Sequence, residues 1–208
     1  MDSTRKIGFF GGSFDPVHCG HVSVAQDAFE QLGLDRLIFV PAAVPPHKLD
    51  WALSSGDDRL EMLRLAAAVN PCFEVSDLEL RRGGVSFTVD TMSEIRAMNP
   101  AAQLFFIIGL DSLAELHLWF RIDDLLELCT VVPFARGGES VDEVAKKIKL
   151  PAVWKERLLS RVIQLHEIEI SSSEIRRRAG AGLSISGLVP PPVELYIARR
   201  NLYQRGKI

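Results

Sequence analysis

Short apolar runs alternate along the chain with longer stretches in which hydrophobic and polar positions follow a helical period. The apolar runs predict strands at Lys6–Phe10, Arg36–Val40, Leu104–Gly109, Thr130–Phe134 and Val162–Ile170. The amphipathic stretches predict helices at His18–Leu32, Asp57–Val69, Thr88–Met98, Asp111–Glu115, Ile122–Cys129, Val141–Lys149, Ser173–Ala179 and Val193–Tyr203. Several of these strands are apolar throughout, as is typical of strands that are buried on both faces. The alternation therefore predicts an α/β fold of the Rossmann-like, doubly wound kind, with a mostly parallel sheet and helices on both faces.

The same alternation of strands and helices indicates the domain organisation, because it continues along the sequence without a domain linker. Two proline-rich breaks, Pro41–Lys48 and Pro190–Pro192, lie between elements of one alternating series, so we interpret them as loops and not as domain linkers. We expect residues 1–208 to form a single domain, with a small C-terminal helical part (about 171–208) packed on it. In such folds, ligands bind outside the carboxyl ends of the strands, where the strand order reverses.

Composition narrows the choice of partners. The chain of 208 residues is 47% hydrophobic, enough for one good core, and its net charge is −3. From residue 155 to 208 there are ten Lys and Arg against five Asp and Glu, which favours a small polyanionic ligand over a long nucleic acid. Three scattered cysteines make a disulfide framework improbable, and no apolar run is long enough to cross a membrane. We expect a cytoplasmic protein.

The segment GFFGGSFDPVHCGHVSVA (residues 8–25) places two glycines and two histidines at the first strand-to-helix turn. Gly11 and Gly12 follow the predicted strand, where a side chain would keep a ligand away from the backbone amides. Asp15 is expected to cap the next helix and Pro16 to occupy its first position. This turn therefore predicts a phosphate site at the positive end of a helix.

His18 and His21 are three residues apart, so they are expected on the same face of this helix. Two imidazoles can donate hydrogen bonds to one phosphate, more strongly when protonated, and would form an anion clamp. A metal site that also uses Cys19 is the alternative, but Cys19 would point off the shared face. Capping or surface exposure is the other alternative. The segment does not contain the dinucleotide-binding pattern G-x-G-x-x-G.

A second anion site is predicted near the other end of the chain, in EISSSEIRRR (residues 169–178). Ser171 and Glu174 match a capping box, which by itself explains only a well-started helix. It does not explain three consecutive serines, or Arg176 near the helix start, where the dipole disfavours a cation. Serine hydroxyls, free amides and a guanidinium that point one way would bind phosphate.

The first-turn sequence GGSFDPVHCGH (residues 11–21) resembles the G-G-T-F-D-P-x-H-x-G-H signature of the HxGH nucleotidyltransferases, with Ser13 in the place of threonine. Residues 170–176 are similar to the I-S-S-T-x-I-R element of the same superfamily, with Ser173 in the place of threonine. The resemblance implies transfer of a nucleotidyl group from a nucleoside triphosphate to a phosphate or hydroxyl acceptor. It implies no general base and no covalent intermediate, since the attacking phosphate is already anionic near neutral pH.

Three further segments resemble the bacterial nicotinate-mononucleotide adenylyltransferases in particular. They are PPHK (residues 45–48), SFTVDT (residues 86–91, with Phe87 where tyrosine is common) and FIIGLDSL (residues 106–113) followed by Trp119. The resemblance implies ATP and nicotinate mononucleotide as substrates, and deamido-NAD and pyrophosphate as products. It implies that Mg²⁺ arrives with ATP, and we name no protein ligand for a metal.

The candidate site residues come from these motifs. The expected catalytic residues are His18, His21, Lys48 and Arg176. The expected ATP-binding residues are Gly11, Gly12, Ser13, Phe14, His18, His21, Gly109, Asp111, Ile170, Ser171, Ser172, Ser173 and Arg176. The expected nicotinate mononucleotide-binding residues are Gly12, Ser13, His47, Lys48, Phe87, Thr88, Trp119 and Arg136.

Two alternatives stay open at this point. One is an adenylyltransferase that acts on nicotinamide mononucleotide or phosphopantetheine, because the first-turn motif would look much the same. The other is a non-catalytic nucleotide-binding protein of the same fold, against which the intact His18, His21 and Arg176 argue. We expect small-molecule substrates as partners, with no nucleic acid and no membrane, and we leave open whether the protein forms a homo-oligomer.

Overall fold

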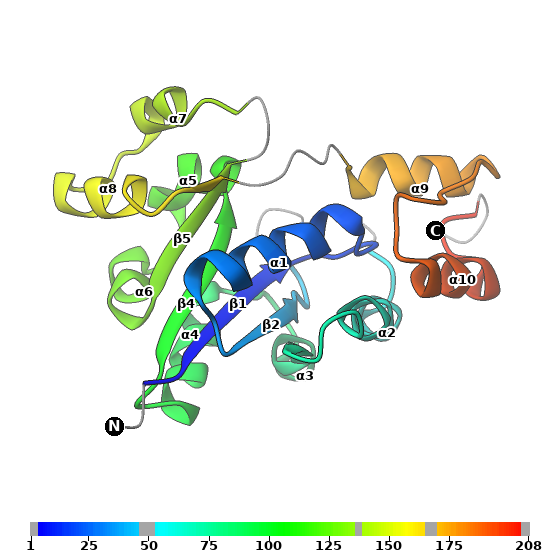
Figure 1. Cartoon of the computed structure of the whole chain (residues 1–208), viewed down its shortest axis with the longest axis horizontal. Coiled ribbons are helices and arrows are strands. Elements are labelled where there is room, and N and C mark those ends of the chain that lie inside the picture. Colours follow the sequence, from blue (N-terminus) through cyan, green and yellow to red (C-terminus); the bar gives the residue numbers. More distant parts are fainter. Residues whose placement is uncertain (1–3, 46–52, 136–138, 165–169, 205–208) are drawn as a thin grey trace.

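The computed structural model of the chain describes residues 4–45, 53–135, 139–164 and 170–204. In this part of the chain, six strands form one sheet in which every neighbouring pair is parallel (Figure 1). The strands are β1 (Lys6–Gly12), β2 (Arg36–Pro41), β3 (Phe73–Val75), β4 (Gln103–Gly109), β5 (Thr130–Ala135) and β6 (Ile163–Gln164). Their order is β3-β2-β1-β4-β5-β6, so the direction of winding reverses between β1 and β4. The expected α/β, doubly wound fold is confirmed.

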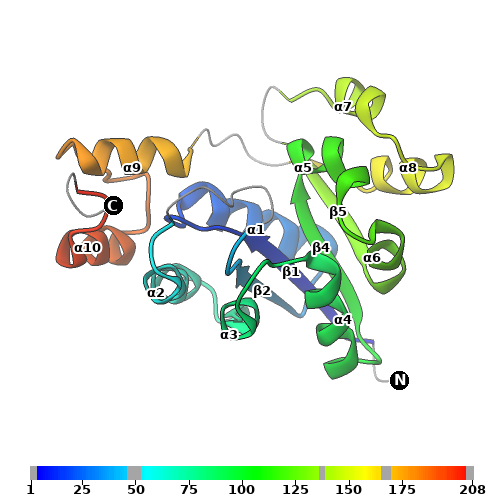
Figure 2. The ribbon, with the colours of Figure 1, turned by 180° about the vertical axis from the view of Figure 1, so that it is seen from behind.

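Helices connect these strands on both faces of the sheet. They are α1 (Cys19–Leu32), α2 (Gly56–Ala67), α3 (Leu78–Arg82), α4 (Thr88–Met98), α5 (Leu110–Glu115), the 3₁₀ helix η1 (Leu116–Leu118), α6 (Ile122–Leu128), α7 (Val141–Lys147), α8 (Ala152–Leu159), α9 (Ser172–Gly180) and α10 (Pro191–Arg200). In the view from behind, α3 and α4 lie in front of the sheet, and α1 lies on its far side (Figure 2).

The structure differs from the predicted elements at a few places. The sequence did not predict β3, α3 or α8, and α10 begins at Pro191, earlier than expected. Proline suits that first position because it needs no helical N–H partner. Of the strand predicted at Val162–Ile170, only Ile163–Gln164 is a strand, residues 165–169 lie outside the described residues, and Ile170 is not in β6.

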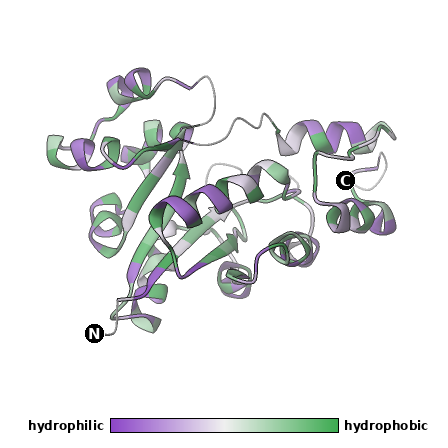
Figure 3. Cartoon of the chain, in the orientation of Figure 1, coloured by the Kyte–Doolittle hydropathy of each residue, from purple (hydrophilic) through white to green (hydrophobic). Residues whose placement is uncertain are grey.

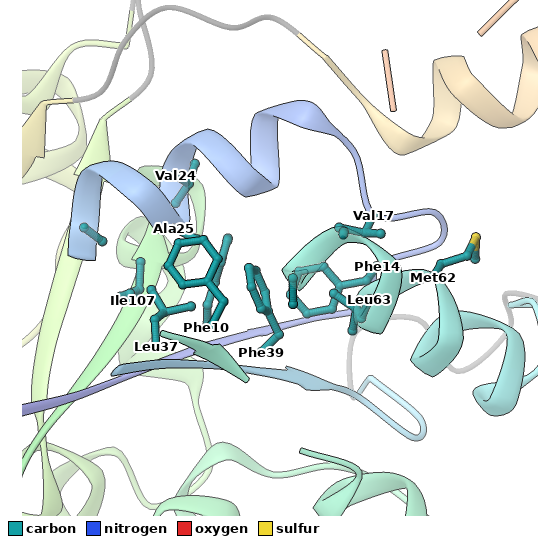
Figure 4. Packing of buried hydrophobic residues seen from close by; sticks show 14 of the residues in the cluster. Phe10, Phe14, Val17, Val24, Ala25, Leu37, Phe39, Met62, Leu63 and Ile107 are labelled. Carbon is teal, nitrogen blue, oxygen red and sulfur yellow. The ribbon is translucent and has the colours of Figure 1, made fainter. Parts of the chain in front are cut away.

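The alternation of side chains along each strand produces two hydrophobic cores, one on each face of the sheet. Figure 3 shows that the central strands carry mostly hydrophobic residues. On one face, Phe10, Phe39 and Phe14 pack beneath α1 and beside α2 (Figure 4). On the other face, Phe9 and Phe106 pack with apolar side chains of α4, α5 and α6. This double burial explains why the strand sequences are apolar throughout.

The C-terminal helices pack onto the core that contains β1 and α1. Ile175 of α9 and Val193 and Ile197 of α10 are buried in the same cluster as Phe10. In Figure 1 these two helices lie at one end of the molecule, beyond α2. The division of the chain into one domain with a small helical part stays a prediction.

Candidate active site

The carboxyl ends of β1 and β4 lie side by side at the point where the sheet reverses direction, and both end in glycine. The sequence had indicated that Gly11 and Gly12 follow the first strand. In the structure they are the last two residues of β1. A Cβ at Gly11 would lie 3.2 Å from the ring of Phe106, and one at Gly12 would lie 3.0 Å from the ring of Phe14. A side chain at either position would press against one of these rings, and glycine leaves the backbone of the strand end bare.

Asp15 does not cap α1, and this prediction was wrong. Its side chain is buried, with only 3% of the residue exposed. Its carboxylate accepts hydrogen bonds from the Tyr203 hydroxyl (2.7 Å) and from the backbone N–H of Ser54 (3.2 Å). Because these partners lie far away in the sequence, the local pattern gave no sign that they would occupy the carboxylate. Pro16 likewise precedes the helix, which begins at Cys19.

His18 is the N-cap of α1, and it forms a reciprocal capping box with His21. Nδ1 of His18 accepts from the backbone N–H of His21 (3.3 Å), and Nδ1 of His21 accepts from the N–H of His18 (3.2 Å). The two rings are stacked, with centroids 3.6 Å apart and an interplanar angle of 25°. The expectation that they share a face is confirmed.

This capping box also fixes the tautomers. A ring nitrogen that accepts a hydrogen bond carries no proton, so each neutral imidazole has its proton on Nε2. His21 is held from the other side by the ring of Phe14, at a centroid distance of 5.0 Å. The capping box therefore orients two Nε2–H groups near the positive end of a helix, where His18 is buried with 3% of the residue exposed. Groups of this kind can bind phosphate oxygens.

The predicted second anion segment contacts the loop that leads to these histidines. Ser171 caps α9 by accepting from the N–H of Glu174, as the sequence predicted. The Ser172 hydroxyl donates to the carbonyl oxygen of Pro16 (2.9 Å). The Arg176 guanidinium donates to the carbonyl oxygen of Asp15 (2.6 Å) and to the Ser173 hydroxyl (3.2 Å). Two segments that lie far apart in the sequence thus meet at one end of the sheet.

A cavity of about 410 Å³ opens at the same end of the sheet, within the size range of small-molecule sites. The predicted ligand residues that line it are Gly11, Gly12, Ser13, Phe87, Thr88, Gly109 and Trp119. Its walls include aromatic rings in pairs: Trp119 meets Phe106 edge-on at 6.3 Å, and Phe87 meets Phe120 at 4.8 Å. Such walls suit a flat heteroaromatic ring.

One side of this cavity is the start of α4. Phe87 is the N-cap residue and provides no side-chain hydrogen bond, because a phenyl ring has no acceptor. Thr88 is the first residue of the helix and lines the cavity. The positive end of the helix therefore faces the cavity without a capping side chain, which favours an anionic group there.

The remaining predicted residues have different outcomes. His47, Lys48 and Arg136 lie outside the described residues. Asp111 lies in the first turn of α5, where its carboxylate accepts from the N–H of Ser112 (2.7 Å). Ile170 packs against the core that contains α1 and precedes the cap of α9.

Arg59 is a buried cation at this site that sequence reasoning missed. Only 2% of the residue is exposed, and burial lowers the pKa of its guanidinium. It donates to the carbonyl oxygens of Ala42 (2.7 Å), Ser13 (2.9 Å) and Ser54 (3.1 Å). It thereby ties together the segments that follow β1 and β2. The only signal in the sequence was a charge in an otherwise ordinary amphipathic helix.

Two further features concern metals and membranes. Within the described ranges, no group of three or more His, Cys, Asp or Glu side chains is placed to hold a metal ion. Likewise, none of the helices in these ranges is both long and apolar enough to span a bilayer.

Comparison with known proteins gives similarity over nearly the whole chain. Residues 9–178 match the family described as cytidylyltransferase-like. A probable nicotinate-nucleotide adenylyltransferase of Opitutus terrae is 44% identical over 199 residues, which cover 96% of this chain and 98% of that protein. One of Pelobacter propionicus with the same description is 39% identical over 211 residues, covering 95% of this chain and 98% of the other.

Solved structures are similar in fold. The nicotinic acid mononucleotide adenylyltransferase of Plasmodium falciparum, complexed with NaAD, aligns with a TM-score of 0.75. The alignment covers 96% of this chain and 97% of that one, at 21% identity. A second structure of the same protein, complexed with APC, gives a TM-score of 0.72 at 20% identity, with the same two coverages.

Proposed function

The chain belongs to the cytidylyltransferase-like family and, within it, to the nicotinate-nucleotide adenylyltransferases, and we propose how its own residues carry out that reaction. The enzyme transfers the adenylyl group of ATP to nicotinate mononucleotide, a step of NAD biosynthesis. The products are nicotinate adenine dinucleotide and pyrophosphate. The observation that supports the residue-level proposal is the hydrogen bond from Arg176 to the carbonyl oxygen of Asp15, in the loop that leads to the stacked His18–His21 pair.

In the proposed reaction, the 5′-phosphate of nicotinate mononucleotide attacks the α-phosphorus of ATP and the bond to the β-phosphate oxygen breaks. The nucleophile is an anionic phosphate oxygen, so no side chain has to remove a proton. Catalysis then consists of aligning the two phosphates and stabilising the charge that develops on their oxygens.

His18 and His21 would bind the α- and β-phosphates through their Nε2–H groups, with His21 closest to the transferred phosphoryl group. The capping box supports this role, because it holds both rings in the tautomer that donates from Nε2. The same bonds disfavour the imidazolium form, in which a proton on Nδ1 would face a backbone N–H.

Arg176 and the serine turn at the start of α9 would hold the β- and γ-phosphates that leave as pyrophosphate. In this structure the guanidinium bonds the Asp15 carbonyl and the Ser173 hydroxyl, two neutral acceptors. A polyphosphate is a stronger acceptor than either, because its oxygens are charged. Lys48, from the loop after β2, would add a further positive charge.

The nicotinate ring would lie in the cavity, between Trp119 and Phe87, with its carboxylate at the start of α4. The uncapped positive end of this helix supports a preference for nicotinate, which is negatively charged, over neutral nicotinamide. His47 and Arg136 would complete the acceptor site.

ATP would enter with a divalent metal ion, for which we propose Mg²⁺ held by phosphate oxygens and water. The ion is then part of the substrate and not a resident cofactor. The cytoplasmic location, the absence of nucleic acid and membrane partners, and the oligomeric state stay predictions.

The proposal is tested by following pyrophosphate release from Mg-ATP. Purified protein is incubated separately with nicotinate mononucleotide, nicotinamide mononucleotide and phosphopantetheine, and the variant His21→Ala is run in parallel to exclude a contaminating activity. We expect the largest kcat/KM with nicotinate mononucleotide. Release with phosphopantetheine alone would refute the acceptor, and silence with all three would favour a nucleotide-binding protein without activity.

A further inference from the structure

Glu79 is a buried carboxylate at the acceptor cavity for which the proposed reaction has no use. It lies in the short helix α3, lines the cavity, and is only 8% exposed. A buried carboxylate costs free energy unless hydrogen bonds or positive charges compensate it. Its position therefore calls for a physical reason.

Two hydroxyl groups donate to this carboxylate from either side of the start of α4. Thr91 Oγ1 donates to Glu79 Oε1 at 2.7 Å, and the Ser86 hydroxyl is also hydrogen-bonded to Glu79. Ser86 directly precedes Phe87, the N-cap, and Thr91 lies one turn into the helix. Glu79 thus holds, from both ends, the short segment that carries Phe87 and Thr88 to the cavity.

Each hydroxyl is in turn the acceptor for a donor from a neighbouring segment. Ser86 Oγ accepts from the backbone N–H of Ala43 at 3.0 Å, in the loop after β2. Thr91 Oγ1 accepts from Arg82 Nη2 at 2.7 Å. Two chains of hydrogen bonds therefore run in the same direction and both end at Glu79. A carboxylate suits this position because it accepts at both oxygens and donates at neither.

The charge of Glu79 has a cost to the folded protein. Burial raises the pKa of its carboxyl group, and the hydrogen bonds from Thr91 and Ser86 and the charge of Arg82 offset this only in part. With the pKa raised in the folded state, the contribution of this group to stability is greatest at low pH and is lost as the pH rises through the folded pKa.

We propose that Glu79 is a positioning residue for the acceptor: through Ser86 and Thr91 it fixes the start of α4 against the loop after β2, and so sets the affinity for nicotinate mononucleotide. The proposal rests on the proposed function, because that function places the nicotinate carboxylate at this helix start. In this proposal Glu79 acts through the two hydroxyls that it accepts from, and not as a ligand of the substrate.

The test is the substitution Glu79→Gln, with Glu94→Gln as the matched control. Glutamine has the size of glutamate, but its amide group must donate to one of two hydroxyls that already accept a hydrogen bond, so one chain has to break or reverse. Glu94 is the same residue type and pairs with the same Arg82 at 3.6 Å, but its side chain is 49% exposed. The control should therefore leave both KM values and kcat unchanged.

For Glu79→Gln we expect the KM for nicotinate mononucleotide to rise about tenfold, as for the loss of one hydrogen bond to a charged group. The KM for ATP and kcat should stay within a factor of about two, since the phosphate-binding groups come from other elements. The melting temperature should change by no more than a few degrees, because the removal of a buried charge offsets part of the cost of the broken hydrogen bond. Thr91→Val should raise the same KM, and Thr91→Ser, which keeps the hydroxyl, should restore it.

Two results would overturn the proposal. One is an unchanged KM for nicotinate mononucleotide in Glu79→Gln. The other is a lower melting temperature together with equal losses in kcat and both KM values, which would assign Glu79 to the fold alone. If Glu79→Gln does not fold, Thr91→Val provides the test. An unchanged KM for nicotinate mononucleotide in Thr91→Val would then refute the proposal. Failure of the proposed function gives a different result: the wild-type protein then releases no pyrophosphate with nicotinate mononucleotide. That result would refute this proposal as well.

Discussion

The guanidinium of Arg176 donates a hydrogen bond of 2.6 Å to the backbone carbonyl oxygen of Asp15, a residue that precedes it by 161 positions. This bond joins the start of α9 to the loop that ends at the His18 cap of α1. The start of α9 therefore lies against the loop that leads to the start of α1. The proposed function uses these two helix starts to bind one triphosphate.

Arg176→Lys tests whether the fork of the guanidinium is needed. Lysine keeps the charge but cannot bond two acceptors in a plane, so we expect kcat/KM for ATP to fall by at least about tenfold, and further in Arg176→Ala. Arg177→Ala is the matched control, because Arg177 lies on the exposed side of α9 and pairs with Glu174. Steady-state kinetics at saturating nicotinate mononucleotide provide the measurement. Equal activity of Arg176→Ala and Arg177→Ala would remove Arg176 from the site.

His21→Ala should lower kcat by two to three orders of magnitude, since one group that stabilises a phosphoryl transition state contributes about 3–4 kcal/mol. The variant also loses half of the capping box, which should lower the stability by about 1 kcal/mol and the melting temperature by a few degrees. Cys19→Ala, two residues away in the first turn, is the control and should keep full activity. A decrease of less than tenfold in kcat would show that His21 has a capping role only.

Arg59→Met should destabilise the protein by about 2–4 kcal/mol, because it removes the guanidinium donor from the buried carbonyl oxygen of Ala42 and from the partly buried ones of Ser13 and Ser54. The corresponding decrease in melting temperature is roughly 5–15 °C for a chain of this size. Arg64→Met, in the same helix but with a side chain that is 57% exposed, should change the stability by no more than about 0.5 kcal/mol. Calorimetry of the three proteins makes the comparison. Similar melting temperatures would contradict a structural role for Arg59.

Asp58 should make the stability depend on pH below about 4, near the ordinary pKa of an aspartate. Burial acts to raise the pKa of Asp58, but hydrogen bonds from Ser55, Tyr196 and Arg200 outweigh it and hold the pKa below its usual value. A lowered pKa means that the contribution is present above the unfolded-state pKa and is lost as the pH falls through the folded-state pKa.

The free-energy difference between the wild type and Asp58→Asn should therefore be largest near neutral pH and should shrink as the pH falls below about 4. Urea unfolding at several pH values measures it. Asp57→Asn, one residue earlier and less buried, should show no such trend. A constant difference at every pH would mean that the charge of Asp58 contributes nothing to the contact between α2 and α10.

Cys129 should resist alkylation in the native protein. Burial raises the pKa of its thiol to about 12, so almost no thiolate is present at pH 8, and the residue is only 8% exposed. Mass spectrometry after treatment with iodoacetamide should find Cys129 unmodified in buffer and modified in urea. Cys72, which is half-buried, serves as the internal comparison. Equal labelling of the two in buffer would refute the buried environment.

The main strands and the long helices could be predicted because their patterns are local. β1, β2, β4 and β5 are apolar on both faces, and Thr88–Met98 has the same bounds in the sequence prediction and in the structure. The short elements β3 and α3 were missed since three to five residues are too few to show a period. α8 was missed as well, although it is longer, and its pattern should have indicated a helix.

The residues of the candidate site also divide into those that the sequence could predict and those that it could not. The paired histidines, the serine turn and the glycines at the ends of β1 and β4 could be found from the sequence, because helix caps and bare strand ends depend on residues close together in the chain. Arg59 and Glu79 could not, since an isolated charge in a helix does not reveal whether it is solvated or buried. Their partners are backbone carbonyls and hydroxyls that only the folded chain brings within reach.

By itself, the sequence determined the fold class, the family and the two segments that we propose bind phosphate, because each of these depends on a contiguous pattern. Only the tertiary structure decided that His18, and not Asp15, caps α1. Asp15 is a good capping residue in isolation, but in the folded protein its carboxylate accepts hydrogen bonds from Tyr203 and Ser54. Which polar group a side chain bonds depends on distances between segments, and these are set when the cores on the two faces of the sheet pack.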